Sequence, residues 1–289
     1  MITNFDTNKV YLAKGMSSEK YVAATGSLLG TLHNQKVHWG FLPLTASPLH
    51  IWARDYMPIQ VSKNKFVRFN YSPDYLKDYP NYKPDTSTIL STLGLQVINS
   101  DIIIDGGNVI SCGDKVIMTD KIFRENSHYD RGVLIYTLSQ LLEAEVVLIP
   151  EDCYDEYGHA DGMVRYMGEG RVLLNNYCDF DKVLRKRLLT ALNPHFGIAE
   201  LHYGAYTERS WAYINFLHVG QHVLIPMIED KLGERAFIQI SDAFPQCKCH
   251  PVYHYKNIVR EGGALNCSTW NILVDLPEEE NSHELPKTV

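Results

Sequence analysis

The sequence feature that most constrains the fold of this chain is a unit that recurs five times along it. Each unit combines a helix-like segment, short apolar strands and one polar motif. The motifs are spaced by 50 to 54 residues and are marked by Asp55, Asp105, His159, Tyr213 and Cys267. A fixed period in this range is typical of propellers and similar repeat folds. Because helices alternate with strands, we predict an α/β repeat rather than an all-β one.

The elements of the repeat are predicted from the spacing of apolar residues. Helical spacing predicts helices over residues 18–32, 86–93, 130–142, 181–192 and 231–244. Short apolar runs predict strands over residues 37–41, 94–98, 146–149, 197–203 and 248–253, and further strands over 66–69, 116–118, 172–174 and 223–225. Closed into a ring, five such units would form a five-bladed β/α propeller with pseudo-fivefold repeats, whose motif loops meet at a central active site.

Composition limits the domain organisation and the partners. No linker rich in Gly, Ser or Pro divides the chain, so we expect one catalytic domain over residues 1–289 with an irregular tail from about 277 to 289. The net charge of −7, without a run of Lys and Arg, argues against a nucleic-acid partner and suits a site that attracts cations.

The compartment is predicted from the same data. The apolar runs are too short to span a membrane, and the first residues lack a signal-peptide pattern. Six cysteines are too few for a disulfide framework in a chain of this length. We therefore expect a cytoplasmic protein with no membrane partner. Its oligomeric state stays open, with a homodimer as one alternative.

The first two motifs offer acidic and aromatic side chains. Residues 51–58 include Trp52, Arg54 and Asp55, which could give a flat cation an aromatic wall and a carboxylate. An Arg-Asp pair at the surface or at a helix cap is the alternative. Asp105 opens the second motif, Asp-Gly-Gly-Asn, after an apolar run. A plain turn at the end of a strand would explain that motif equally well.

The third and fourth motifs add an imidazole and an amide. His159 and Asp161 stand two apart, so in an extended segment they would point to one face and serve one site. A histidine beside a carboxylate suits general acid–base chemistry, and a loop histidine bonded at the surface is the alternative. Asn215 lies in an apolar segment that we predict to be a strand. A buried amide needs partners, so structural bonding and substrate contact both stay open.

The fifth motif contains the candidate nucleophile. Gly262 and Gly263 allow a turn and a close approach to the main chain, and Cys267 follows them between Asn266 and Ser268. Polar neighbours do not suit a cysteine that only fills a core, although a buried structural thiol remains the alternative. We predict that Cys267 is a nucleophile.

A metal site is the competing use of cysteine and histidine. Cys247, Cys249, His250 and His254 are candidates, but paired zinc ligands usually have two to four residues between them. Cys249 and His250 also alternate across a predicted strand, so we expect no metal site. No lysine stands in a position that indicates chemistry, and no phosphate-binding loop is present.

A thiol, an imidazole and several carboxylates together suit a guanidinium substrate. The guanidinium group is planar and always charged, and its N–H donors match two carboxylates. Its carbon is a weak electrophile, so it requires a strong sulfur nucleophile. A free cysteine is only slightly ionised near neutral pH. A bound cation and a charged His159 would both favour the thiolate.

The five motifs together resemble one family. "WARDYMP", "DGGN", "GHADG", "AYINF" and "EGGALNCST" are similar, in this order, to the signature loops of the agmatine deiminase and bacterial peptidylarginine deiminase family, within the guanidine-modifying pentein superfamily of five-bladed β/α propellers. The resemblance extends from Trp52 to Ile272. Asn266 departs from it, because members often have histidine beside the nucleophile, and the chain also lacks the Trp-rich opening of agmatine deiminases.

The resemblance implies a role for each matching residue. Cys267 would be the nucleophile and His159 the acid and base, while Asp55 and Asp161 would hold the guanidinium group. The substrate-binding residues would be Trp52, Arg54, Asp105 and Asn215. The implied reaction is hydrolysis through a covalent Cys thiouronium intermediate to a ureido product and ammonia, with no cofactor and no metal.

The substrate and the acceptor stay open. The acids and tyrosines of residues 70–78 would suit agmatine, whose far end is an ammonium group. Arg68 is the candidate cation for a substrate carboxylate, but it lies inside a predicted strand. Free arginine or an arginyl peptide are the alternative substrates. An amidinotransferase would use the same intermediate and an amine acceptor, and a binding protein without activity is a further alternative.

Overall fold

The computed structural model describes residues 1–43, 50–79, 82–228 and 231–276. The tail that we predict to be irregular, residues 277–289, lies outside the described residues. Within the described ranges, no helix combines the length and the apolar character that a membrane crossing needs.

The described residues form five three-stranded sheets that share one topology. In each sheet the middle strand pairs antiparallel with one neighbour and parallel with the other. The sheets are β15 (Thr269–Ile272), β1 (Lys9–Leu12) and β2 (His38–Phe41); β3 (Ile59–Ser62), β4 (Lys65–Asn70) and β5 (Val97–Ile103); β6 (Ile110–Ser111), β7 (Lys115–Thr119) and β8 (Glu145–Ile149); β9 (Val164–Gly168), β10 (Arg171–Leu174) and β11 (Gly197–Glu200); and β12 (Leu217–Val219), β13 (His222–Pro226) and β14 (Lys248–Val252).

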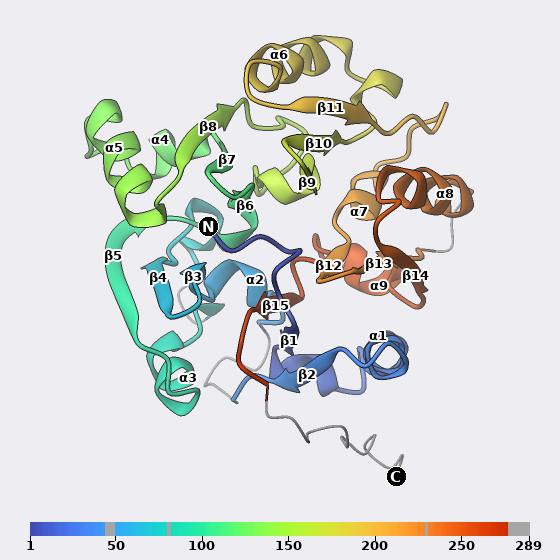
Figure 1. Cartoon of the computed structure of the whole chain (residues 1–289), viewed down its shortest axis with the longest axis horizontal. Coiled ribbons are helices and arrows are strands. Elements are labelled where there is room, and N and C mark those ends of the chain that lie inside the picture. The colour runs from blue at the N-terminus through green and yellow to red at the C-terminus, as the bar shows by residue number, and fades with distance from the viewer. Residues whose placement is uncertain (44–49, 80–81, 229–230, 277–289) are drawn as a thin grey trace.

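Each parallel pair of strands is connected through a helix. The connecting helices are α1 (Val22–Asn34), α3 (Thr86–Thr92), α5 (Arg131–Leu142), α6 (Lys182–Leu192) and α8 (Gly233–Ala243), and α4 (Lys121–Glu125) precedes α5. Figure 1 shows these five helices at the periphery, with the strands closer to the middle of the molecule. The alternation of helix and strand confirms the predicted α/β class, because every crossover between parallel strands needs such a connection.

The predicted helices agree with the structure to within four residues at either end. The start of three of them has a local cause, because the side chains of Asp85, Asp130 and Asp181 accept hydrogen bonds from the first free N–H groups of α3, α5 and α6. The strand predicted over residues 94–98 is wrong in its bounds. Gly94 has φ +66° directly after α3, so the chain turns there and β5 begins only at Val97.

Two local predictions around the motifs are also wrong. The segment of Asn215 is a one-turn helix, α7 (Trp211–Ile214), rather than a strand, and Asn215 ends it. Asp161 belongs to a short 3-10 turn over Ala160–Gly162, so its relation to His159 does not follow from strand alternation. In both places the polar motif leaves the regular pattern shortly before the first strand of a sheet, β9 or β12.

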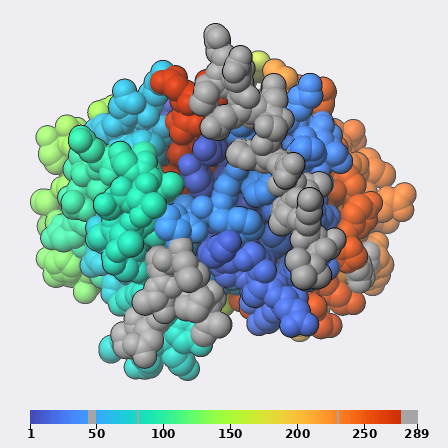
Figure 2. Space-filling model, turned by 90° about the horizontal axis from the view of Figure 1, so that it is seen from below, coloured from blue at the N-terminus to red at the C-terminus, as the bar shows by residue number. Residues whose placement is uncertain are grey.

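The last strand completes the first sheet. β15 pairs antiparallel with β1, so Thr269 lies opposite Leu12. In Figure 2 the last described segment, in red, adjoins the N-terminal segment, in blue, on the same face. Cys267 stands two residues before β15, so the pairing of the two ends of the described chain positions the fifth motif.

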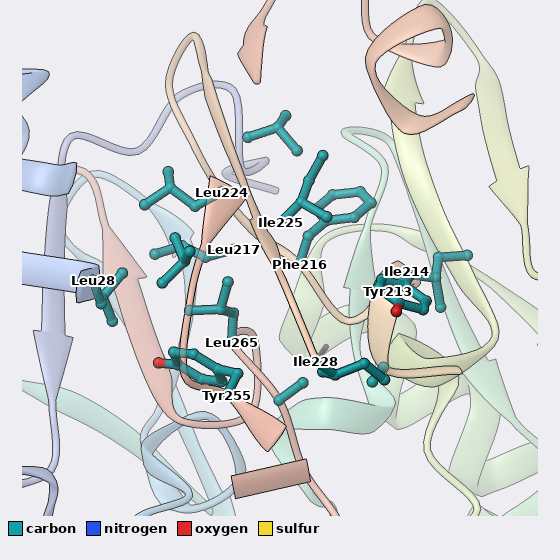
Figure 3. Packing of buried hydrophobic residues seen from close by; sticks show 14 of the residues in the cluster. Leu28, Tyr213, Ile214, Phe216, Leu217, Leu224, Ile225, Ile228, Tyr255 and Leu265 are labelled. Carbon is teal, nitrogen blue, oxygen red and sulfur yellow. The ribbon is translucent and has the colours of Figure 1, made fainter. Parts of the chain in front are cut away.

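A buried hydrophobic cluster anchors the same motif. Leu265 is fully buried within the largest cluster, which also contains Leu28 of α1, Leu217 of β12 and Tyr255. Figure 3 shows Leu265 near Leu217 and Tyr255. Complete burial of a leucine side chain contributes about 1.5–3 kcal/mol, so the loop before Cys267 is held by packing as well as by hydrogen bonds.

Candidate functional site

The polar motifs meet around two adjoining cavities, which we call the acidic lobe and the aromatic lobe. The acidic lobe measures about 330 Å³, and its lining includes the carboxylates of Asp152, Asp155, Glu156, Glu208 and Glu261, of which Glu156 and Glu261 also line the aromatic lobe. The aromatic lobe measures about 340 Å³, and its distinctive lining residues are Trp52, Tyr71, Tyr75, Tyr79 and Tyr82. Both lobes are lined by Cys267, His159 and Tyr157, so they join at the thiol and the imidazole.

Glycines allow the motif loops to pack this closely. A Cβ on Gly106 would overlap the carbonyl oxygen of Arg54, and one on Gly107 would lie 2.8 Å from both Asp55 Oδ1 and His159 Nδ1. A side chain at either position would therefore separate the first, second and third motifs. The Gly-Gly pair of the second motif is explained by this close approach, so the simpler interpretation of a strand-ending turn is incomplete.

The glycine pair of the fifth motif has the same function. Gly262 adopts φ +94°, where a Cβ would overlap the hydroxyl of Tyr157, and a Cβ on Gly263 would overlap the ring of Trp52. The loop that leads to Cys267 therefore passes directly against the two aromatic side chains that border the aromatic lobe.

Cys267 is buried beside a carboxylate and an amide. Its Sγ lies 3.5 Å from Asp161 Oδ2, and its backbone N–H donates to Asn215 Oδ1 at 3.3 Å. Burial raises the pKa of the thiol well above 9, and Asp161 and Asp55 raise this pKa further because a thiolate would be repelled by their charges. The protein without a bound cation therefore carries Cys267 as a thiol.

His159 lies between two carboxylates. Its Nε2 is 2.7 Å from Asp105 Oδ2, and its Nδ1 is 3.7 Å from Asp55 Oδ1. Burial lowers the pKa of His159, but Asp55 and the hydrogen bond to Asp105 outweigh burial and raise the pKa to about 9. The imidazole is therefore charged at neutral pH.

The two carboxylates on either side of the thiol differ in environment. Burial raises the pKa of Asp55 to about 7, although its Oδ1 accepts the N–H of Gly107 at 3.0 Å. Asp161 Oδ2 accepts a hydrogen bond of 2.7 Å from Asn266 Nδ2. The residue that departs from the family pattern therefore orients one of the carboxylates that we expected to hold the guanidinium group.

A buried lysine that sequence analysis missed completes the network. Lys121 Nζ lies 2.8 Å from Asp105 Oδ2 and 3.2 Å from Glu125 Oε1, over the ring of Tyr75 at 4.9 Å. Lys121 lines neither lobe, so its burial does not contradict the expectation that no lysine stands in a position that indicates chemistry. The i,i+4 spacing of Lys121 and Glu125 was the only available signal, and such pairs are common on exposed helices.

Six of the eight predicted site residues line the lobes. Trp52 and Asp55 line the aromatic lobe, Asp161 and Asn215 line the acidic lobe, and His159 and Cys267 line both. The other two, Asp105 and Arg54, lie elsewhere.

Asp105 and Arg54 line neither lobe. Asp105 lies behind His159, between its imidazole and Lys121, and its Oδ1 has no hydrogen-bond partner in the described part of the chain. Arg54 points away from both lobes and donates to the backbone carbonyl of Asn266 at 3.4 Å and to the side chain of Asn271.

One group of described side chains has the spacing of metal ligands. Cys178, Asp179 and His202 lie together, with His202 Nδ1 2.6 Å from Asp179 Oδ1 and 3.6 Å from Cys178 Sγ. The carboxylate of Asp179 also accepts the backbone N–H groups of Tyr203 and Gly204. These bonds give the carboxylate a structural role, and the group lines neither lobe.

Comparison with solved structures shows the same fold in several deiminases. An agmatine deiminase of C. jejuni superposes with a TM-score of 0.72 at 17% identity, over 96% of each chain. An arginine deiminase assigned in Porphyromonas gingivalis gives 0.72 and 17% over 94% of this chain and 97% of the other. The agmatine deiminase of Enterococcus faecalis gives 0.71 and 16% over 94% of each. At this level of identity the similarity concerns the fold.

Comparison by sequence is more specific. A search of curated proteins found no match. The model of the Porphyromonas-type peptidyl-arginine deiminases matches residues 17–272, which include all five motifs. The match confirms the resemblance carried by the motifs, and the chain belongs to the Porphyromonas-type peptidyl-arginine deiminase family.

Proposed function

We propose that this protein is a guanidine deiminase that hydrolyses the guanidinium group of agmatine or a related arginine-derived compound to a ureido product and ammonia. The observation that carries the proposal is the convergence of a thiol, a charged imidazole and two carboxylates where the two lobes join. Cys267 Sγ lies 3.5 Å from Asp161, and His159 Nδ1 lies 3.7 Å from Asp55. Family membership supports the same chemistry.

The guanidinium group binds between Asp55 and Asp161 in this proposal. Asp55 lines the aromatic lobe and Asp161 the acidic lobe, so the junction of the lobes lies between them. A planar cation there satisfies both carboxylates and lies against Trp52.

The bound cation activates the sulfur. In the free protein the carboxylates and burial keep Cys267 protonated. A guanidinium group offsets the negative charge of Asp55 and Asp161, so the thiol releases its proton to solvent when the substrate binds. The thiolate then attacks the guanidinium carbon. The imidazolium of His159 gives its proton to the departing amino group, the C–N bond breaks, and ammonia leaves a covalent thiouronium on Cys267.

Hydrolysis of the intermediate restores the enzyme. The neutral imidazole of His159 removes a proton from water while the oxygen attacks the same carbon. The C–S bond then breaks, the sulfur leaves as a thiolate, and the product oxygen loses its remaining proton to give a ureido group. When the product departs, the thiolate regains a proton from solvent, and ammonia takes up the other released proton. The sum of the two halves is one guanidinium and one water consumed, and one ureido product and one ammonium ion formed.

The charge of the acidic lobe supports a substrate with a basic tail. Five carboxylates line it in addition to Asp161, whereas its basic lining residues in the described part of the chain are Arg260 and the imidazole of His159. An ammonium group, as in agmatine, would be attracted there. The carboxylate of free arginine would be repelled, and Arg68 lines neither lobe, since it donates instead to Ser87 Oγ.

Product analysis tests the proposal. Agmatine, arginine and an arginyl peptide are incubated with the full-length protein, and ammonia and ureido product are measured. We expect agmatine to be the best of the three. A preference for the arginyl peptide would contradict the basic-tail proposal, and formation of a new guanidine from an added amine would indicate an amidinotransferase.

Labelling of the thiol distinguishes an enzyme from a binding protein. A haloacetamidine mimics the guanidinium group and should modify Cys267, with protection by agmatine. Cys178→Ser is the matched control, because Cys178 lies outside the lobes and should not affect labelling. Absence of labelling together with absence of ammonia would refute the deiminase proposal.

We further propose that the five sheets are the blades of a five-bladed β/α propeller and that residues 1–289 form one domain. The shared strand order and the pairing of β15 with β1 support this proposal. A single cooperative unfolding transition is expected, and two separate transitions would contradict it.

A reducing, cytoplasmic location suits the proposed thiol chemistry. All six cysteines are free, and Cys267 must stay reduced to react. Fractionation of cells that produce the untagged protein tests this proposal. We leave the oligomeric state to light scattering, with a homodimer as one alternative.

A further inference from the structure

A third, smaller cavity lies beyond the loop of Cys267. It measures about 60 Å³, enough for one small ion or a few water molecules. Asn266 lines this cavity, whereas Cys267 lines the two lobes. No described residue lines both this cavity and either lobe. Figure 1 shows the N-terminal segment, which contributes Asn4 and Thr7 to the lining, crossing the middle of the molecule.

Two arginine side chains line this cavity without a carboxylate partner. Arg165 is 2% exposed, and its Nη1 and Nη2 are buried with no hydrogen-bond partner among the described residues. Arg54 donates only to neutral acceptors, the carbonyl of Asn266 and the side chain of Asn271, within the described part. Buried charges are normally paired, so two unpaired guanidinium groups at one cavity require compensation.

The surroundings compensate for only part of this charge. Arg165 lies over the ring of Phe216, with its guanidinium carbon 4.7 Å from the ring centre. This contact covers one face of the guanidinium group and leaves the in-plane N–H groups without acceptors. Burial and Arg54 both lower the pKa of Arg165, to about 10, while Asp161 raises it, so the side chain stays charged at neutral pH. The hydroxyl of Ser111, on the same lining, is also buried without a partner in the described structure.

We propose that this cavity binds a small monovalent anion of the size of chloride. The anion accepts hydrogen bonds from Arg165 and Ser111 and offsets the charges of Arg165 and Arg54. Water would satisfy the N–H groups but would leave the like charges uncompensated. A cavity of about 60 Å³ has room for one such anion. This proposal does not rest on the proposed deiminase activity.

Chloride binding is measured directly on the full-length protein. We expect the protein to broaden the ³⁵Cl NMR line of sodium chloride, and we expect bromide to remove this broadening by competition. At constant ionic strength, replacement of gluconate by chloride should raise the melting temperature by roughly 2–5 °C, because gluconate is too large to enter. Equal melting temperatures in the two salts and no broadening would show that the cavity holds only water.

Variants locate the binding. Arg165→Met should abolish both the broadening and the chloride dependence of the melting temperature. Ser111→Ala, which removes only one hydroxyl, should weaken chloride binding several-fold and keeps the proposal testable if Arg165→Met does not fold. Arg171→Met is the matched control, because Arg171 is exposed and lies outside the cavity. Broadening that persists in both Arg165→Met and Ser111→Ala would place the chloride elsewhere and overturn the proposal.

Discussion

The lobes and the small cavity have opposite charge, although they lie on two sides of the same loops. The acidic lobe is lined by carboxylates, whereas two guanidinium groups line the small cavity. Neighbouring residues are divided between them. Asp55 faces the lobes while Arg54 faces the small cavity, and Cys267 faces the lobes while Asn266 faces the small cavity. A one-residue step along the chain therefore moves from the lining of a lobe to the lining of the small cavity.

This difference shows how the thiol is controlled. The carboxylates on the side of the lobes raise the pKa of Cys267, whereas Arg54 and Arg165 are cations that attract a thiolate. The thiol of Cys267 is therefore exposed to opposite electrostatic effects from the carboxylates and from the two arginines. A substrate cation offsets the negative charge of the carboxylates, so it favours ionisation of the sulfur only while it is bound.

The largest expected effect is the loss of the nucleophile. Cys267→Ser should lower turnover of agmatine by roughly 10⁴-fold or more, because a serine hydroxyl is far less ionised than a thiol. Steady-state ammonia release measures the loss, with Cys178→Ser as the control of unchanged activity. Substantial activity in Cys267→Ser would contradict the proposal that the reaction takes place at Cys267, where the two lobes join.

Loss of one clamping carboxylate comes next. Asp55→Asn should lower turnover by roughly 10²–10³-fold, because one charged partner of the guanidinium group is lost. Asp55 is also the main cause that raises the pKa of His159 to about 9. Activity that needs the imidazolium should fall above about pH 9 in the wild type, and at lower pH in the variant. A pH–rate profile with an unchanged alkaline limb would contradict this role of Asp55.

Stability should follow the same titration. The pKa of His159 is raised from 6.5 to about 9 in the folded state, so its contribution is fully present below about pH 6.5 and is lost as the pH rises to 9. The free energy of unfolding should decrease by up to roughly 3 kcal/mol over this window. Urea unfolding at several pH values measures it, and a stability that rises between pH 6.5 and 9 would contradict the assignment.

Removal of the buried lysine, Lys121, tests how much its ion pairs contribute to folding stability. Lys121→Met leaves Glu125 without its cation and leaves Asp105 with His159 alone, and it should lower the free energy of unfolding by about 3–5 kcal/mol. Lys115→Met is the matched control, since the ion pairs of Lys115 involve exposed carboxylates and should change stability by less than about 1 kcal/mol. Chemical denaturation compares the two variants, and equal losses would contradict a buried network.

The smallest effect concerns the tail of the substrate. Glu208→Gln removes one charge from the acidic lobe and should raise KM for agmatine by roughly two- to five-fold with little change in kcat. Glu169→Gln lies on an exposed turn outside the lobes and is the matched control. A lower KM for agmatine in Glu208→Gln would show that the acidic lobe does not attract a basic tail.

Sequence analysis predicted the site residues that recur at the 50- to 54-residue spacing of the repeat. The Gly-Gly pairs and the regular spacing marked Asp55, His159 and Cys267, because each repeat requires its loop to turn at the same point. The periodic pattern contains no information about Lys121 or Arg165. Lysine and arginine are usually exposed, and the burial of these two follows from packing between different sheets, as with Arg165 over Phe216.

The direction of the Arg54 side chain could not be predicted either, because its segment also lacks a periodic signal. Arg54 stands in the first motif and was expected to contact the substrate, but a short helix, α2 (Ala53–Tyr56), turns it away from the side that Asp55 faces. A one-turn helix is too short to show a periodic apolar pattern, so only the structure could place Arg54 and Asp55 on different sides.

The pairing of β15 with β1 also has a consequence for the newly made protein. A ribosome releases the segment of Cys267 and β15 only after the other four sheets have been synthesised. Until that strand docks, Asp161 and His159 have no thiol beside them, so a nascent or truncated polypeptide cannot modify a guanidine in the cell. Completion of the first sheet by β15 therefore makes reactivity depend on a strand that is synthesised after the other four sheets.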